Sequence, residues 1–464
     1  VGYFGFRRAS LIEPFWNAYY LALVLSIADK IEKERLPNKD KRVFSYRFKW
    51  NKEKSSCFDE VHWYDYRKYC VELSKKFKYI VQTDIADFYD RIYHHRLENE
   101  LKPISANVSN KLIKLLKFFS NGTSYGLPVG GPASRILAEL ALNRTDHHLV
   151  ARGLTFCRYA DDYTIFCNSE AEAYNILLFL ADKLSNDGLG LQKSKTRIMS
   201  TTEFQEIHSY LDPAPSSSSS ADEEQKLLNI SVQYDPYSDS ALEDYRELKK
   251  AVREIDIIGI LSREVAKTRI DQTVTKQAIN SIKVLKSKDK THALRILLDQ
   301  NNLMTLSPVF ISVMRAIRKI YMDQEKHNQN LIDRALISLF DQQSHLISIE
   351  INLCYVIQVL AFNHSKEKEK LLISIYEKTN DVLIRRLIIT AMANWKTKYW
   401  LSDIRKTFNA LTVWERRAFI YASYSMGDEG SHWRKQNKGL LSRKEILMKD
   451  WFSERHQAKK PVLV

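Results

Sequence analysis

Apolar positions in the first part of the chain switch between the spacing of helices and that of strands. Residues 14–37 repeat apolar side chains every four positions, which predicts one helix that ends at a proline. Residues 42–50 and 189–199 alternate apolar and polar side chains, which predicts two strands. Residues 169–188 return to a helical spacing and end in Asn-Asp-Gly. Helices and strands mixed in this order indicate an α+β domain over residues 1–210.

Two adjacent aspartates interrupt a pair of strand-forming runs. In RYADDYTIFC, aromatic and β-branched residues flank Asp161 and Asp162, so the sequence predicts a hairpin with both carboxylates at its tip. In KYIVQTD, a buried strand ends at Asp84. If these strands are neighbours in one sheet, the three carboxylates converge, and Mg²⁺ prefers carboxylate oxygen. We therefore expect a two-Mg²⁺ site for nucleotidyl transfer, with a solvated turn as the alternative.

A loop rich in glycine and proline lies between the two acidic strands. The stretch GLPVGGPASRILAEL runs from this loop straight into a helix with one apolar face. Glycine has no side chain to keep the backbone away from a base pair, so the loop is a candidate substrate contact. An ordinary tight turn before a helix is the alternative.

The second half of the chain is expected to be helical. Residues 211–235 are rich in Ser and Pro and predict a linker or loop. Over residues 236–464, pairs of helical segments recur over about 35 residues, which is typical of HEAT-like repeats. A plain helical bundle is the alternative. Stacked repeats would offer a long face to nucleic acid or to another copy of the chain.

Charge and composition point to a polyanionic partner. The 464 residues include 71 Lys and Arg against 56 Asp and Glu, a formal net charge of +15. This excess favours nucleic acid first and an acidic membrane surface second. No run of about 18 apolar residues is present, so we expect no membrane-spanning helix. The five cysteines form no CxxC pair, which suits a cytoplasmic protein without a disulfide framework or a zinc site. The first residue is Val rather than Met, so we expect the natural N-terminus to lie upstream.

Four short stretches together resemble the motifs of reverse transcriptases. TDIADFYDRI resembles motif A, GLPVGGPASRILAEL motif B, RYADDYTIF motif C and GLGLQKSKT motif D, in the order and at the spacing of that family. RVFSYR, which precedes them, resembles the fingers motif. The resemblance covers residues 40–200. It implies a right-hand polymerase palm with fingers, followed by an all-α HEAT-like domain in the place of the thumb.

The same resemblance implies roles at the centre of the site. Asp84 and Asp161 would be the principal ligands of Mg²⁺, with Asp162 beside them. Tyr89 matches the position at which an aromatic ring blocks a ribose 2′-hydroxyl and so selects dNTPs. Lys195 matches the motif D lysine that assists the departure of pyrophosphate.

Substrate contacts around this centre are also implied. We expect Arg47 to contact the triphosphate, because a guanidinium fits phosphate oxygens. For Arg47 and Lys195 alike, a solvated surface charge is the alternative. The residues expected to contact the nascent base pair are Gly126, Pro128, Gly130 and Gly131.

Motif B departs from one common pattern of the family. Val129 and Gly130 stand where group II intron and retron enzymes usually have Gln-Gly. The combination of LPVG with SRILAEL is similar to abortive-infection and other prokaryotic defence-associated reverse transcriptases. We therefore expect an antiphage DNA polymerase, for which template-independent synthesis primed by a tyrosine of the protein is one mode.

Two other interpretations remain open. One is a retron-like enzyme that copies a noncoding RNA template, and the other is an inactive nucleic-acid-binding scaffold. The expected partners are dNTPs, a DNA product and an RNA template or noncoding RNA. A homo-oligomer formed through the helical half is a further expectation.

Overall fold

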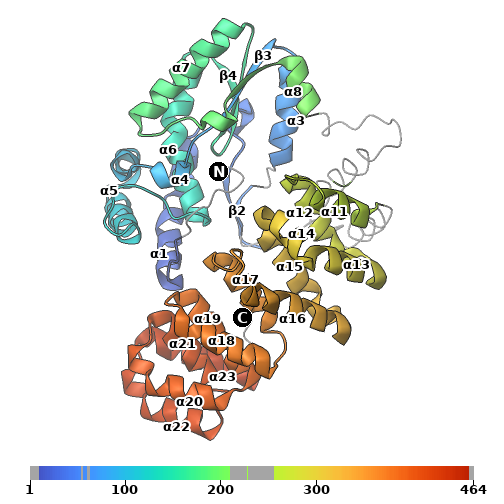
Figure 1. Cartoon of the computed structure of the whole chain (residues 1–464). Helices are drawn as coiled ribbons and strands as arrows, with labels where there is room; N and C mark the ends of the chain where they lie inside the picture. The colour runs from blue at the N-terminus through green and yellow to red at the C-terminus, as the bar shows by residue number, and fades with distance from the viewer. Residues whose placement is uncertain (1–9, 54–55, 60–62, 209–226, 228–254, 459–464) are drawn as a thin grey trace. The chain divides into compact units, whose positions relative to one another are not determined.

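The structure is a computed structural model, and it divides into two compact units, residues 1–216 and 217–464. Each unit is described by itself. The predicted linker over residues 211–235 lies outside the described residues, apart from Leu227, so its boundaries and its character stay predictions. The structure describes residues 10–53, 56–59, 63–208, 227 and 255–458 (Figure 1).

The first unit is built on a four-stranded antiparallel sheet with strand order β4-β5-β3-β6. The predicted buried strand and the predicted acidic hairpin are both present, as β3 and as β4 with β5. The strands are β3 (Tyr79–Asp84), β4 (Thr155–Tyr159), β5 (Asp162–Cys167) and β6 (Arg197–Ser200), and a separate hairpin pairs β1 (Phe48–Asn51) with β2 (Ser56–Phe58).

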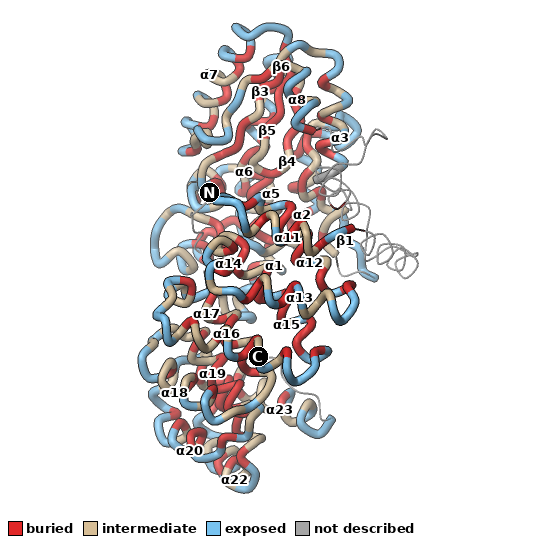
Figure 2. Tube along the Cα trace, turned by 45° about the vertical axis from the view of Figure 1, so that its right-hand side comes forward, coloured by how far each residue is buried: buried red, intermediate tan, exposed pale blue. Residues whose placement is uncertain are grey.

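Both faces of the central strands are covered. Alternate side chains point to opposite faces of a sheet, so neighbouring residues of one strand belong to two different cores. Val81 and Ile165 face the larger core, which the helices α1, α5, α6 and α7 complete. Ile80 and Phe166 face a smaller core under α3 and α8. Figure 2 shows the resulting buried positions along β3 and β5. The helices of this unit are α1 (Pro14–Leu25), α2 (Ala28–Glu34), η1 (Asn38–Asp40), α3 (Trp63–Ser74), α4 (Phe88–Arg91), α5 (His94–Phe119), α6 (Pro132–Ala151), α7 (Glu170–Asn186), η2 (Lys193–Lys195) and α8 (Thr201–Ile207).

The prediction of one helix over residues 14–37 was wrong, since the chain forms α1 and α2 with a break between them. At the break the Ser26 hydroxyl donates a hydrogen bond to the Leu23 carbonyl at 2.7 Å. Such local bonds compete with the helical pattern. The break redirects the chain while Ile27 remains buried in the core.

The two predicted strands over residues 42–50 and 189–199 were largely wrong. In the first, the Arg35 guanidinium donates to the carbonyls of Ser45 and Tyr46 at 2.8 and 3.0 Å, so a neighbouring strand cannot use these carbonyls in the same way. Tyr46 has a left-handed backbone, with φ of +46°. In the second, the Lys195 amide donates to the Gln192 carbonyl at 3.0 Å in a compact turn, and β6 begins only afterwards.

The described part of the second unit, residues 255–458, is helical, as predicted. Side-chain caps begin many of its helices, including two complete capping boxes at Thr412 with Glu415 and at Ser442 with Glu445. The helices are α11 (Ile257–Val265), α12 (Gln272–Ser281), η4 (Ile282–Val284), α13 (Ser287–Leu298), α14 (Gln300–Thr305), η5 (Ser307–Val309), α15 (Phe310–Ile320), η6 (Tyr321–Asp323), α16 (Lys326–Asp341), α17 (Glu350–Leu360), α18 (Lys366–Lys378), α19 (Val382–Trp395), α20 (Lys398–Lys406), η7 (Phe408–Ala410), α21 (Val413–Ala422), α22 (Asp428–Gln436), η8 (Lys438–Leu440) and α23 (Arg443–Gln457).

Alternate helices of the second unit pack side by side. The helices α12, α15, α17, α19, α21 and α23 each contact the next in that order and form one layer. The intervening helices α16, α18 and α20 contact this layer in turn. Stacked helical pairs of this kind are consistent with the HEAT-like prediction, which stays a proposal. Within the described ranges, no helix is both long enough and apolar enough to cross a membrane.

Candidate active site

Three aspartates meet at one end of the central sheet. The antiparallel register of β3 and β5 places Asp84 directly opposite Asp162. The turn between β4 and β5 supplies Asp161, and the Ile85 amide donates to the Asp161 carbonyl at 3.3 Å. Ala160, just before it, has a left-handed backbone with φ of +54°. The structure therefore brings together the carboxylates that the sequence placed 77 positions apart or more, Asp84 and the adjacent pair.

Burial and mutual repulsion perturb these carboxyl groups. Burial, and next the nearby Asp84 carboxylate, raise the pKa of Asp161 to about 7. Burial also raises the pKa of Asp162, while the Arg67 guanidinium acts in the opposite direction. Two close carboxylates without a cation cannot both ionise easily, so one tends to keep its proton. Perturbed carboxyl groups of this kind concentrate at functional sites.

Carboxylate oxygens without a hydrogen-bond partner indicate whether these aspartates could bind a metal ion. Asp84 is 5 % exposed, and its buried Oδ1 has no hydrogen-bond partner among the described residues. Its Oδ2 contacts the Lys195 ammonium. Over the same residues, no three carboxylate, imidazole or thiol side chains are arranged to hold one metal ion. The carboxylate chemistry of Asp84 and Asp161 is compatible with a shared divalent cation, and the ligand roles of Asp84, Asp161 and Asp162 all stay predictions.

Lys195 reaches Asp84 because the segment after α7 is anchored at two points. The Gln192 amide donates to the Asp84 carbonyl at 2.7 Å. Further back, the Arg96 Nε donates to Asp187 Oδ1 at 2.8 Å, which ties the segment to α5. Lys195 itself is in η2, and its side chain is about half exposed. The contact with Asp84 places a positive charge at the site, and a role in pyrophosphate release stays a prediction.

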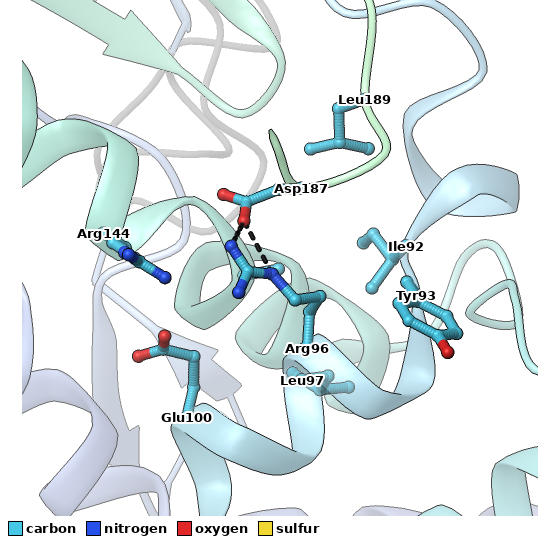
Figure 3. Close-up of a pocket in the computed structure, with 9 residues that line it drawn as sticks. Ile92, Tyr93, Arg96, Leu97, Glu100, Arg144, Asp187 and Leu189 are labelled. Carbon is cyan, nitrogen blue, oxygen red and sulfur yellow. Dashed lines mark hydrogen bonds and ion pairs between the residues drawn. The ribbon is translucent and has the colours of Figure 1, made fainter. Parts of the chain in front are cut away.

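A small pocket surrounds the ion pair of Arg96 and Asp187, as Figure 3 shows. None of the residues that line the pocket was predicted to belong to the active site. We interpret the pocket as a packing gap around the bond between Arg96 and Asp187, which anchors the segment after α7. The lining residues are Ile92, Tyr93, Arg96, Leu97, Glu100, Ala141, Arg144, Asp187 and Leu189.

Tyr89, rather than its neighbour Phe88, is the aromatic residue that interacts electrostatically with Asp161. Phe88 is 3 % exposed and belongs to the core. Burial raises the pKa of the Tyr89 hydroxyl, and the nearby Tyr46 and Asp161 raise it further. The Leu127 amide donates to the Tyr89 carbonyl at 2.8 Å, so the glycine-rich loop begins against this residue.

The glycine-rich loop contains residues with different environments. Gly126 and Gly130 have φ of +97° and +112°, a backbone that favours glycine. A Cβ on Gly126 would lie 3.6 Å from the Asp90 carbonyl, whereas one on Gly130 or Gly131 would meet no described atom within 4 Å. Pro128 is buried. Gly130 and Gly131 therefore face open space, and contact between this loop and a base pair stays a prediction.

Arg47 is held within the first unit. Its Nε donates to the Val43 carbonyl at 3.1 Å, and its two terminal nitrogens bond to the Leu36 carbonyl at 2.7 Å and to Glu32 at 2.9 Å. The side chain is 4 % exposed. A triphosphate would have to displace these partners, so the geometry lends no support to the predicted triphosphate contact.

Arg135 is a cation near the site that the sequence reasoning missed. Its guanidinium lies 4.9 Å from the centre of the Tyr46 ring. It also acts electrostatically on Tyr89, as Asp161 does. Arg135 stands in SRILAEL, which was interpreted as the start of a helix and as part of the resemblance to motif B, with no role for the arginine itself. Sequence alone could not rank it above Arg47, because each is an arginine inside a motif.

A buried ion network supports the turn that presents Asp161. The Arg158 guanidinium donates to the Ala160 carbonyl at 2.8 Å and to Asp146 at 2.9 Å. It also lies 3.0 Å from Glu139, which Arg35 contacts at 2.7 Å. The network joins α6 and the segment after α2 to the hairpin. No sequence signal pairs these residues, of which Arg35 lies far from the others along the chain.

Comparison with known proteins agrees with this geometry. Residues 24–260, just over half of the chain, match the family model of "Reverse transcriptase (RNA-dependent DNA polymerase)". The chain is also 27 % identical over 126 residues to the retron Ec86 reverse transcriptase of Escherichia coli. That match covers 26 % of this chain and 38 % of the relative. The chain therefore belongs to the reverse transcriptase family.

Proposed function

We propose that the protein is an active DNA polymerase that adds dNTPs to a 3′-hydroxyl by two-metal nucleotidyl transfer. One observation carries this proposal: the Asp84 and Asp161 carboxylates lie together at the end of the sheet, and one buried oxygen of Asp84 has no partner among the described residues. Burying a carboxylate oxygen without a partner is costly, which favours a bound cation beside Asp84 Oδ1. Membership of the reverse transcriptase family supports the same reaction.

Asp84 and Asp161 would hold Mg²⁺, with Asp162 next to them. A Mg²⁺ ion held by these carboxylates would supply activation of the attacking hydroxyl and neutralisation of charge on the pyrophosphate. Lys195, which now contacts Asp84, is the nearest candidate to donate a proton to the departing pyrophosphate. Tyr89 is the candidate residue that excludes a ribose 2′-hydroxyl.

We further propose a role in antiphage defence, with synthesis that needs no template and is primed by a tyrosine of the protein. The similarity of LPVG and SRILAEL to abortive-infection reverse transcriptases supports this role. The test is phage plating on bacteria that express the wild-type chain or the Asp161→Asn variant. Equal plaque counts on both strains would exclude a defence role that depends on polymerisation.

A second candidate is templated synthesis on a noncoding RNA. The similarity to the retron Ec86 reverse transcriptase favours it. The two modes differ in their products. Purified protein is incubated with labelled dNTPs and Mg²⁺ with no added template, and the product is treated separately with protease and with RNase. Label that stays bound to protein until protease is added supports self-priming, and a product that requires RNA supports the retron-like mode.

A folded protein that incorporates no dNTP in either format would leave the inactive scaffold as the remaining interpretation. The control is the Asp161→Asn variant, which is expected to be inactive in both formats. Incorporation by the wild-type chain and none by this variant is the result that the proposal predicts.

A further inference from the structure

One layer of the helical unit has an unusual charge distribution. The helix α15 contains Arg315, Arg318 and Lys319 but no Asp or Glu, and α19 contains Arg385 and Arg386 but no Asp or Glu. Between them, α17 has a single acidic residue, at its first position. These helices contact one another in sequence, and α19 contacts α21. The layer therefore carries positive charge on α15 and α19, and α17 between them has no Lys or Arg.

Arginines of this layer lie over aromatic rings of the next helix or of their own helix. Arg315 of α15 lies 5.2 Å from the ring centre of Tyr355 on α17, and its Nε donates to the Tyr355 hydroxyl at 3.0 Å. Arg386 of α19 and Arg417 of α21 lie 5.4 and 5.6 Å from the ring centre of Trp414. Tyr355 and Trp414 are only half-buried. We call these residues, together with Lys319, the Arg–aromatic face.

Cations on this layer lie close to other cations. Burial and the Arg417 charge lower the pKa of Arg386. On α15, the Lys319 charge and burial, with burial the larger cause, lower the pKa of Lys283 in η4. Among the described residues, no carboxylate pairs with Arg386 or Lys319. A bound anion would stabilise the like charges of Arg386 with Arg417 and of Lys319 with Lys283.

Two neighbouring arginines, unlike Arg386, form ion pairs with glutamates of adjacent helices. Arg385 pairs with Glu415 at 3.1 Å and packs on Tyr376 of α18, and Arg416 pairs with Glu445 at 2.7 Å. Arg386 is one residue after Arg385, so its side chain is about 100° further around α19. Its guanidinium lies over Trp414, and among the described residues no ion pair joins it to Glu415. Its charge is therefore not used by that structural ion pair.

We propose that the Arg–aromatic face binds single-stranded DNA. The exposed Arg315 and Lys319 and the half-buried Arg386 would contact the phosphates, and the rings of Tyr355 and Trp414, together with the guanidinium planes over them, would stack on bases. Paired bases cannot stack on protein rings in this way, so we expect single strands to bind better than a duplex. The inference rests on the proposed function only in naming the source of the strand, which is the polymerase's own product.

Binding is tested on the full-length protein without dNTPs. The probe is a labelled oligodeoxythymidine of about 30 nucleotides, followed by fluorescence anisotropy over a range of salt concentrations. The test variant is Arg315→Gln/Lys319→Gln/Arg386→Gln. The matched control is Lys288→Gln/Lys366→Gln/Lys370→Gln, which removes the same charge from exposed lysines of α13 and α18.

We expect the test variant to raise the Kd at least about tenfold and to lower the slope of log Kd against log salt by about 2, from three lost phosphate contacts. The control should stay within about twofold of the wild-type Kd. Trp414→Leu should weaken single-strand binding about tenfold with the slope unchanged, and duplex binding should not respond.

The proposal is overturned if the two triple variants bind equally well, or if duplex binding falls as much as single-strand binding. The same variants are also measured with an oligouridine probe. If the test variant loses affinity for this probe alone, the occupant is RNA, and the proposal is equally overturned. Because dNTPs are absent, an inactive polymerase can still give the expected result, and an active one can fail it. Melting temperatures of all variants check that the helical unit remains folded.

Discussion

Replacing Arg158 by Met should destabilise the first unit strongly. The guanidinium bonds to Asp146 at 2.5 and 2.9 Å and lies 3.0 Å from Glu139, and all three side chains are at most 2 % exposed. Without Arg158, the hydrogen bond that remains to Asp146 among the described residues comes from the Tyr163 hydroxyl at 3.2 Å. Removing one partner of a buried ion pair costs about 3–5 kcal/mol. For a unit of this size we therefore expect the melting temperature to fall by about 6–20 °C.

Differential scanning calorimetry on the full-length chain measures this fall. Arg144→Met, an exposed arginine on the same helix as Asp146, is the matched control and should shift the transition by less than about 2 °C. Adding Asp146→Asn to Arg158→Met should restore part of the loss, since it removes the uncompensated charge. If Arg158→Met behaves like the control, or if the added substitution restores nothing, the buried network does not stabilise the unit as argued.

Three further predictions concern the site itself. Asp161→Asn should abolish dNTP incorporation with a melting temperature near that of the wild type, and residual incorporation in the folded variant would count against a metal role. Tyr89→Ala should admit ribonucleotides in a competition assay, whereas Phe88→Ala should instead destabilise the fold by about 3–5 kcal/mol, because Phe88 is a core residue. An unchanged preference for dNTPs in Tyr89→Ala would move the exclusion to another residue. Gly126→Ala should destabilise by about 1 kcal/mol or more because its φ is +97°, while Gly131→Ala, with φ in the ordinary range and open space, should be neutral. Equal unfolding midpoints for the two alanine variants would contradict that distinction.

Local chemistry explains which elements could be predicted from the sequence. The acidic hairpin and the strand ending at Asp84 have strong apolar patterns, and the turn of the hairpin suits adjacent aspartates. These local signals determine both elements, and contacts with distant residues do not override them. The helices of the second unit likewise begin at side-chain caps such as Asp271 and Asp381, which are visible in the sequence.

Contacts between distant residues explain the failures. The strand expected over residues 42–50 is absent from most of that range, because Arg35 donates hydrogen bonds to the carbonyls of Ser45 and Tyr46. No sequence feature near Ser45 and Tyr46 indicates these bonds. The same limit applied to the site. Only the folded chain distinguishes Arg47, whose nitrogens bond to neighbouring groups, from Arg135, which lies over Tyr46 near the aspartates.

Incorporation of labelled dNTP as a function of Mg²⁺ concentration tests the central claim most directly. The comparison is between the wild-type chain and Asp84→Asn, at equal concentration and with equal melting temperatures. We predict that the wild type incorporates dNTP with a saturable dependence on Mg²⁺, and that Asp84→Asn incorporates none at any concentration. Incorporation by folded Asp84→Asn at the wild-type rate, with the same dependence on Mg²⁺, would contradict the assignment of Asp84 and Asp161 as the metal-binding centre of a polymerase.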